Sequence, residues 1–80
     1  MPNPTKLRQH SALIALGKAI RHIRNQQGVS QEKLALMAGV DRSYIGRVER
    51  GDNNVAILTL QKIAHALKVS VSDLIAEAGL

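Results

Sequence analysis

Three glycines in the middle of the chain, Gly28, Gly39 and Gly51, each follow a short segment with the residue spacing of a helix. In those segments apolar residues recur at steps of three and four, which places them on one face of a helix. Glycine then ends the helix, because it readily adopts the left-handed conformation common at helix ends. No segment has the strict alternation of apolar and polar residues that is typical of a strand. We therefore expect an all-α fold built from short helices.

The spacing and the residues at the segment ends predict five helices, over about 11–27, 31–38, 42–50 and 57–67 and a short one after Ser70. Ser30 and Asp41 are the expected N-caps of the second and third helices, and Ser70 and Asp73 form a capping box for the fifth. The residues expected to face the core are Leu13, Leu16, Ile20, Ile23, Leu34, Ala35, Met37, Ala38, Tyr44, Ile45, Val48, Ile57, Leu60, Ile63, Ala64, Leu67, Leu74 and Ile75.

Aliphatic side chains must hold this bundle together. The 80-residue chain has one Tyr, no Phe and no Trp, so a large aromatic-lined ligand pocket is not expected. It has no cysteine, which excludes disulfides, thiolate metal sites and a thiol nucleophile. No apolar run approaches the roughly 20 residues of a membrane span, and the N-terminus lacks a signal-peptide core. We expect a cytoplasmic protein of one domain, with no membrane association.

The chain is basic, with a formal net charge of +5 and an isoelectric point near 10.3. Arg42, Arg47 and Arg50 are crowded into one short segment, whereas Asp73 and Glu77 lie near the end of the chain. A phosphate-binding surface has such a composition, although many basic proteins bind no nucleic acid. Residues 1–10 carry prolines and basic side chains and few apolar ones, which predicts a flexible basic arm ahead of a domain at 11–80.

The second and third predicted helices have the features of a helix-turn-helix. Ala35 is small where the two helices would meet, and Gly39 permits a sharp turn between them. The apolar residues suited to lock the pair are Leu34, Val40, Ile45 and Val48, and those expected on the exposed face of the third helix are Arg42, Ser43, Gly46, Arg47 and Arg50. Such a face can enter the major groove of DNA, where arginine makes bidentate contacts with guanine. The alternative is an ordinary solvated helix face.

Residues 16–74, about three quarters of the chain, resemble the phage repressor and Cro-like helix-turn-helix family, also called the xenobiotic response element family. The similarity lies in LGKAIRHIRNQQGVSQEKLALMAGVDRSYIGRVERG and in LTLQKIAHALKVSVSDLI. The segment DRSYIGRVERG is also similar to the controller proteins of restriction–modification systems. The resemblance implies a compact five-helix bundle of the phage-repressor DNA-binding-domain type, with the helix-turn-helix at its second and third helices.

The resemblance also implies roles for individual residues. Arg24 and Glu49 match a buried ion pair that ties the first helix to the recognition helix. We expect Glu49 to be structural, since a free carboxylate facing phosphates would repel them. The residues that match base-reading positions are Arg42, Ser43 and Arg47, and those that match contacts with the DNA backbone are Gln31, Tyr44, Arg50, Asn53 and Asn54.

The chain departs from the family just before and within its fourth helix. Relatives usually have Pro-Thr or Pro-Ser where this chain has Val55 and Ala56, and a polar residue where it has Leu58. An exposed Leu58 is either an idle surface leucine or part of a subunit contact together with Val55, Ile75 and Leu80. These four residues therefore have two alternative roles: they form the contact of a homodimer, or they are ordinary surface residues.

Catalytic and metal-binding patterns are not recognisable in the sequence. His10, His22 and His65 lie on different segments, without the spacing of a metal site. No Ser–His–Asp arrangement, paired-carboxylate site or phosphate-binding glycine loop is present. We expect no enzyme activity, no metal, no cofactor and no small-molecule ligand.

The sequence thus predicts a DNA-binding transcriptional regulator that acts as a homodimer on a symmetric double-stranded operator. One alternative is an antitoxin-type regulator, although the chain has little beyond its fifth helix that could bind a toxin. Another is a protein-interaction module that kept the fold and lost DNA binding, against which the grouped arginines argue. RNA binding is disfavoured because the sequence offers no aromatic stacking surface.

Overall fold

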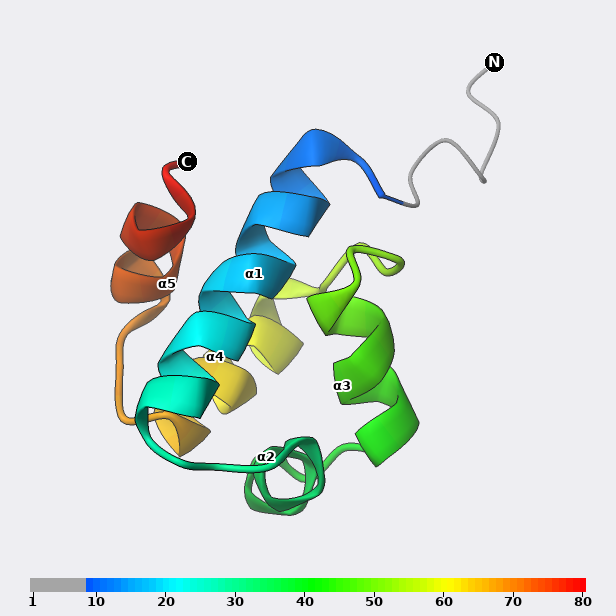
Figure 1. The fold of residues 1–80 in the computed structure, drawn as a ribbon, viewed down its shortest axis with the longest axis vertical. Helices are drawn as coiled ribbons and strands as arrows, with labels where there is room; N and C mark the ends of the chain where they lie inside the picture. Colours follow the sequence, from blue (N-terminus) through cyan, green and yellow to red (C-terminus); the bar gives the residue numbers. More distant parts are fainter. Residues whose placement is uncertain (1–8) are drawn as a thin grey trace.

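The computed structural model describes residues 9–80 and contains five helices in this range, as expected (Figure 1). They are α1 (Ser11–Gln26), α2 (Gln31–Ala38), α3 (Arg42–Glu49), α4 (Ile57–Ala66) and α5 (Val71–Ala78). The described residues form no strand, so the all-α bundle is confirmed. The basic arm expected at 1–10 lies mostly outside the described residues. Of its two described residues, His10 caps α1, because its Nδ1 accepts a hydrogen bond from the Ala12 amide at 3.1 Å.

Hydrogen bonds at the helix ends explain where α2 and α5 begin. The Ser30 hydroxyl accepts from the backbone N–H three residues later at 3.0 Å. Ser70 and Asp73 exchange two hydrogen bonds of 2.9 and 3.0 Å, which form the expected capping box. The backbone N–H of Ser70, and then its hydroxyl, stabilise the charged carboxylate and lower the pKa of Asp73. Asp41 holds the N-cap position of α3, but its side chain makes no capping hydrogen bond.

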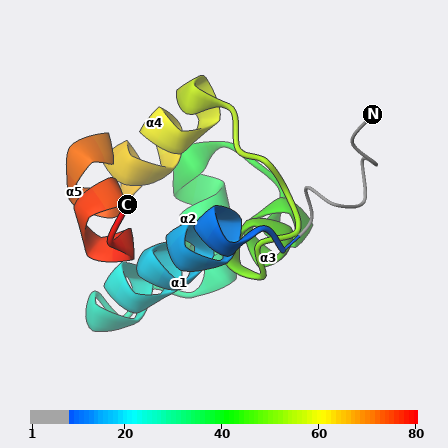
Figure 2. The ribbon, with the colours of Figure 1, turned by 90° about the horizontal axis from the view of Figure 1, so that it is seen from above.

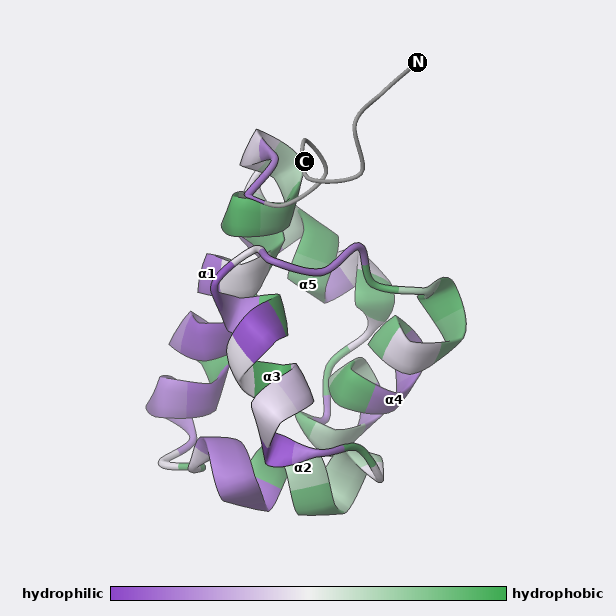
Figure 3. Cartoon of the chain, turned by 90° about the vertical axis from the view of Figure 1, so that its right-hand side faces the viewer, coloured by the Kyte–Doolittle hydropathy of each residue, from purple (hydrophilic) through white to green (hydrophobic). Residues whose placement is uncertain are grey.

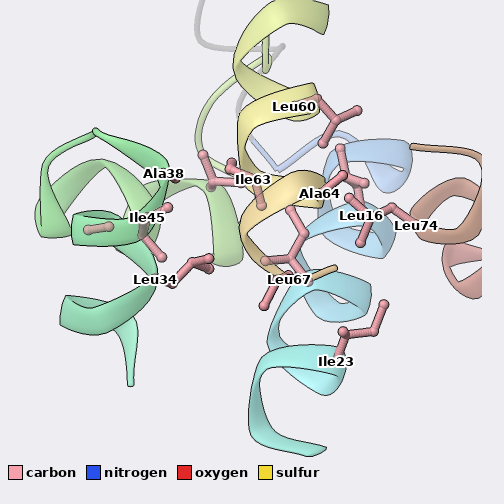
Figure 4. Close-up of a cluster of buried hydrophobic side chains, with 13 residues drawn as sticks. Leu16, Ile23, Leu34, Ala38, Ile45, Leu60, Ile63, Ala64, Leu67 and Leu74 are labelled. Atoms are coloured by element: carbon pink, nitrogen blue, oxygen red, sulfur yellow. The ribbon is translucent and has the colours of Figure 1, made fainter. Parts of the chain in front are cut away.

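Helix α4 occupies the middle of the core. In Figure 4 its buried side chains lie between those of α2 and α3 on one side and those of α1 and α5 on the other. The core is aliphatic throughout, as the composition requires. Its buried residues are Leu16, Ile20, Ile23, Leu34, Ala35, Ala38, Ile45, Val48, Leu60, Ile63, Ala64, Leu67 and Leu74.

Two residues expected in the core are exposed instead. Met37 is 44% exposed, because Leu34 and Ala38 define the buried stripe of α2 and position 37 lies beside it. Ile57 is 61% exposed. It lies on the same face of α4 as Leu60, as the spacing predicts. Because it is in the first turn, however, the neighbouring helices do not extend far enough to cover it. Of the other expected core residues, Leu13, Tyr44 and Ile75 are half-buried.

Gly17 brings the backbones of α1 and α3 into contact. A Cβ atom at this position would lie 2.5 Å from the carbonyl oxygens of both Val48 and Glu49. Such distances are far inside van der Waals contact, and the atoms in the way belong to the backbone. Only glycine therefore allows α1 to lie this close to the C-terminal end of α3. This contact was not predicted, although a glycine inside a helical pattern is a signal of close packing.

A buried ion pair joins the same two helices further along α1. The guanidinium of Arg24 donates to both carboxylate oxygens of Glu49, from Nε at 2.7 Å and from Nη2 at 3.0 Å. Its Nη1 donates to the Val29 carbonyl oxygen at 2.8 Å. Gln31 adds a third donor to Glu49, with Nε2 2.9 Å from Oε1. The side chains of Arg24 and Glu49 are 9% and 2% exposed, so neither charge has water as an alternative partner.

We predict that Gly17→Ala destabilises the domain by about 3 kcal/mol or more, since the neighbouring carbonyl groups cannot move without shifting α3. The matched control is Gly28→Ala, where a Cβ meets nothing within 4 Å and only the positive φ of 67° opposes alanine. That control should lose about 1–2 kcal/mol. Urea unfolding followed by circular dichroism measures both losses. A loss at position 17 no larger than that at position 28 would refute the close contact.

For the ion pair we predict that Arg24→Met or Glu49→Leu alone costs about 3–5 kcal/mol, because each leaves a buried charge without its partner. The double variant should be more stable than the sum of the two losses implies, since it removes both charges. Thermal and urea unfolding of the four proteins give the coupling energy. Strictly additive losses would mean that the two side chains do not stabilise one another.

Candidate nucleic-acid interface

Helices α2 and α3 form the helix-turn-helix that the sequence predicts. Gly39 ends α2 with a positive φ of 71°, and the Val40 amide donates to the Ala35 carbonyl oxygen at 2.9 Å, which closes the turn. On the inner side of α3, Ile45 and Val48 are buried in the core. Figure 2 shows α3 on the opposite side of the molecule from α5. The outer side of α3 is therefore available to a ligand.

The outer face of α3 carries exposed polar side chains. Arg42 and Ser43 lie in its first turn, Arg47 follows about one turn later, and Arg50 is the C-cap; all four are exposed. Gly46 was expected on this face, and the structure contradicts that expectation by burying it.

The two neighbours of Gly46 explain its burial. A Cβ at Gly46 would lie 3.2 Å from Nη1 of Arg50 and 3.9 Å from Oε1 of Gln31. Gly46 thus lies directly beneath the side chains of Arg50 and Gln31, for which the family resemblance implies contacts with the DNA backbone. Gln31 is half-buried, and its amide nitrogen, which donates to Glu49, has a second hydrogen to offer.

The loop after α3 folds back along the helix. The Gly51 amide donates to the Val48 carbonyl oxygen at 3.0 Å, and the Asp52 amide donates to the Arg47 carbonyl oxygen at 2.9 Å. This pair of bonds, with Gly51 at a φ of 77°, is a Schellman motif. Gly51 also packs against α1, since a Cβ there would lie 2.9 Å from Cγ1 of Ile14. In Figure 3 the loop is hydrophilic along most of its length and passes the C-terminal end of α3 on its way to α4.

Charged and amide groups of the loop contact the arginines of α3. Arg50 Nε lies 3.2 Å from Oδ2 of Asp52, and the Gln9 side chain donates to the other oxygen of that carboxylate at 3.3 Å. The bond from Arg50 uses its Nε and not its terminal nitrogens. Asn53 is half-buried and Asn54 is exposed. The loop and the outer face of α3 thus form one continuous polar surface, which we call the α3 surface.

The four residues considered for a dimer contact differ in how far they are buried. Leu58 and Leu80 are 69% and 57% exposed, whereas Val55 and Ile75 are half-buried and pack against the core. Ile57, next to Leu58, was expected in the core but is an exposed apolar residue. The first turn of α4 therefore carries more exposed apolar surface than expected.

The histidines have separate surroundings. The His22 side chain lies 3.4 Å from Glu77 of α5, while His65 is an exposed residue of α4. Among residues 9–80 no group of three or more His, Asp or Glu side chains is placed to hold a metal ion. None of the described helices has the length and apolar character needed to cross a membrane.

Comparison with known proteins identifies the family. Residues 20–74 match the helix-turn-helix family HTH_3. The chain is 45% identical over 65 residues to control protein C.SmaI of Serratia marcescens, covering 81% of this chain and 77% of that protein. It is 40% identical over 63 residues to control protein C.BamHI of Bacillus amyloliquefaciens, covering 78% of each. The restriction-modification controller protein C.AhdI of Aeromonas hydrophila has a similar structure, with a TM-score of 0.80 and 42% identity over 81% of this chain and 98% of that one. The chain therefore belongs to the HTH_3 helix-turn-helix family of transcriptional regulators.

Proposed function

We propose that this protein binds double-stranded operator DNA through the α3 surface and so regulates transcription. The observation that carries the proposal is the exposure of Arg42, Ser43 and Arg47 on one side of a helix whose other side is fixed in the core. A short helix with small and basic residues on its outer face fits the major groove. The similarity to control proteins supports a binding protein and not an enzyme.

In this proposal α3 lies in the major groove with its first turn toward the base edges. Arg42 and Arg47 pair with guanines, since arginine can donate two hydrogen bonds to O6 and N7, and Ser43 accepts or donates at a neighbouring base. Glu49 takes no part, because Arg24 and Gln31 already hold both of its oxygens on the inner side. The base contacts provide the sequence preference.

Residues at the edges of the α3 surface contact the sugar–phosphate backbone and fix the register. Gln31 is the first residue of α2, where its second amide hydrogen and the helix N-terminus both favour a phosphate. Tyr44, Arg50 and Asn54 surround the base-reading side chains and reach the flanking phosphates. Asn53 lies in the same loop, with its side-chain amide next to Nε of Arg47.

A symmetric operator requires two recognition helices about 34 Å apart, related by a two-fold axis. We propose that a second copy of this chain packs against the first turn of α4, where Leu58 and its neighbour Ile57 are exposed, with Leu80 contributing from the end of α5. Val55 and Ile75 add the part of their surface that the core leaves uncovered. Figure 2 places α5 on the opposite side of the molecule from α3, whereas Thr59 in the first turn of α4 lines one pocket with Tyr44 and Arg47, so this contact lies beside the α3 surface.

We predict that the protein selects a symmetric site from a random pool of duplexes and that its affinity falls steeply with salt. About six to ten cationic contacts per dimer give a slope of log K against log salt of about −5 to −9. Arg42→Ala should cost about 1–3 kcal/mol on the selected site and relax the preference at particular base pairs, whereas Arg50→Ala should weaken all duplexes equally. Fluorescence anisotropy of labelled duplexes at several salt concentrations measures the salt slope of the wild type and the affinities of both variants. Failure to bind any duplex at low salt would refute the proposed function.

The dimer contact predicts that Leu58→Glu raises the dissociation constant of the dimer at least about tenfold, because a charged group replaces buried apolar surface. Leu36→Glu is the matched control, since Leu36 is 80% exposed on α2 and lies outside the proposed contact. Analytical ultracentrifugation at several concentrations compares the two variants with wild type. Unchanged dimerisation of Leu58→Glu would place the subunit contact on another face.

A further inference from the structure

Arg47 is exposed, yet its guanidinium group has neighbours from two different elements. On α3 the guanidinium group lies over the ring of Tyr44, with 5.8 Å between the guanidinium carbon and the ring centroid. This distance is within the range of a cation–π contact. From the loop, the side-chain amide of Asn53 approaches its Nε. A long exposed side chain otherwise samples many rotamers, and ordering it on binding costs free energy.

The amide of Asn53 is oriented by two partners at once. Oriented to satisfy both, its Nδ2 donates to the Asp52 carbonyl oxygen at 3.1 Å, and its Oδ1 accepts from Nε of Arg47 at 3.3 Å. The reverse orientation would place the amide nitrogen against the Arg47 donor. Asn53 therefore offers Arg47 an acceptor at a fixed place.

The backbone holds Asn53 at this place. The Schellman motif ties the residue before Asn53 to the carbonyl group of Arg47 itself, so that the loop returns to the side chain it contacts. The packing of Gly51 against Ile14 anchors the start of the loop on α1. The position of Asn53 thus depends on the core and not on a mobile side chain.

The use of Nε by Asn53 restricts how Arg47 can contact a base. A guanidinium group can pair with guanine through Nε and one terminal nitrogen, or end-on through its two terminal nitrogens. Only the end-on arrangement keeps the bond to Asn53. A lone arginine would have both arrangements available, together with many rotamers that reach no base.

We propose that Asn53 is a positioning residue for Arg47, which it holds ready for an end-on contact with guanine, and that it controls base preference without touching a base. This inference rests on the proposed function. It replaces the phosphate contact that the family resemblance implied for Asn53. A direct phosphate contact by Asn53 is the competing outcome of the test below.

The first test needs no DNA. The ¹⁵Nε order parameter of Arg47, measured by NMR relaxation in the free protein, should exceed that of Arg42, the internal reference on the same helix. It should fall to the value of Arg42 in Asn53→Ala and stay high in Asn53→Asp, which keeps the acceptor oxygen. An Arg47 order parameter that is unaffected by Asn53→Ala would overturn the proposal.

The second test uses duplexes that differ at the base pair whose preference is lost in Arg47→Ala. Asn53→Ala should reduce discrimination at that pair about three- to tenfold, while leaving the affinity for non-specific DNA and its salt slope unchanged. In the Arg47→Ala background the same change should have no further effect. A uniform loss on all duplexes, additive with Arg47→Ala, would show a phosphate contact and overturn the inference while the proposed function stands. Absence of duplex binding by wild type would overturn both.

Discussion

Glu49 meets Arg24 of α1 and Gln31 of α2 where three helices converge, and the placement of α3 depends on this contact. Burying the two charges costs solvation, so the pair adds less to net stability than its short distances suggest. Its geometry is demanding, however, because any shift of α3 lengthens the hydrogen bonds between two buried charges. The contact at Gly17 acts in the same direction, since it lets the backbone of α1 touch the end of α3. Together they fix the angle at which the outer face of α3 meets a ligand.

This constraint matters because α3 has only eight residues. A helix of this length is not stable alone in water, so its conformation comes from packing. The proposed base-reading side chains of Arg42, Ser43 and Arg47 are exposed and contribute little to that packing. The residues of α3 that do contribute to it, Ile45, Val48 and Glu49, face inward. The sequence of the outer face can therefore change with little effect on the fold. Such a separation allows one scaffold to serve many operators.

The parts of the fold predicted from the sequence are those with local causes. The five helices and the caps at Ser30 and Ser70 follow from residues within a few positions of one another. Ile57 and Gly46 were assigned to the wrong environment because their burial depends on how far neighbouring elements reach, and Met37 because it lies beside the buried stripe of α2. The partnership of Arg24 and Glu49, 25 residues apart, came from the family resemblance, since helical spacing contains no information on it. Asn53 was missed as a neighbour of Arg47 because the reversal of the chain at Gly51 is a property of the folded loop.

Under the proposed function, the residues of this protein do not divide cleanly into those that contact the DNA backbone and those that read bases, because the loop after α3 supplies a residue that does neither. A loop residue that fixes the conformation of a recognition arginine changes specificity through the entropy of that side chain and the nitrogens it can offer. Gly51 is essential to this arrangement, since its positive φ and its contact with Ile14 permit the reversal. Two proteins with identical recognition helices could then prefer different operators if their loops differ at position 53. If Asn53 positions Arg47 as proposed, specificity belongs to the helix and its loop together, and comparing recognition helices alone would miss that contribution.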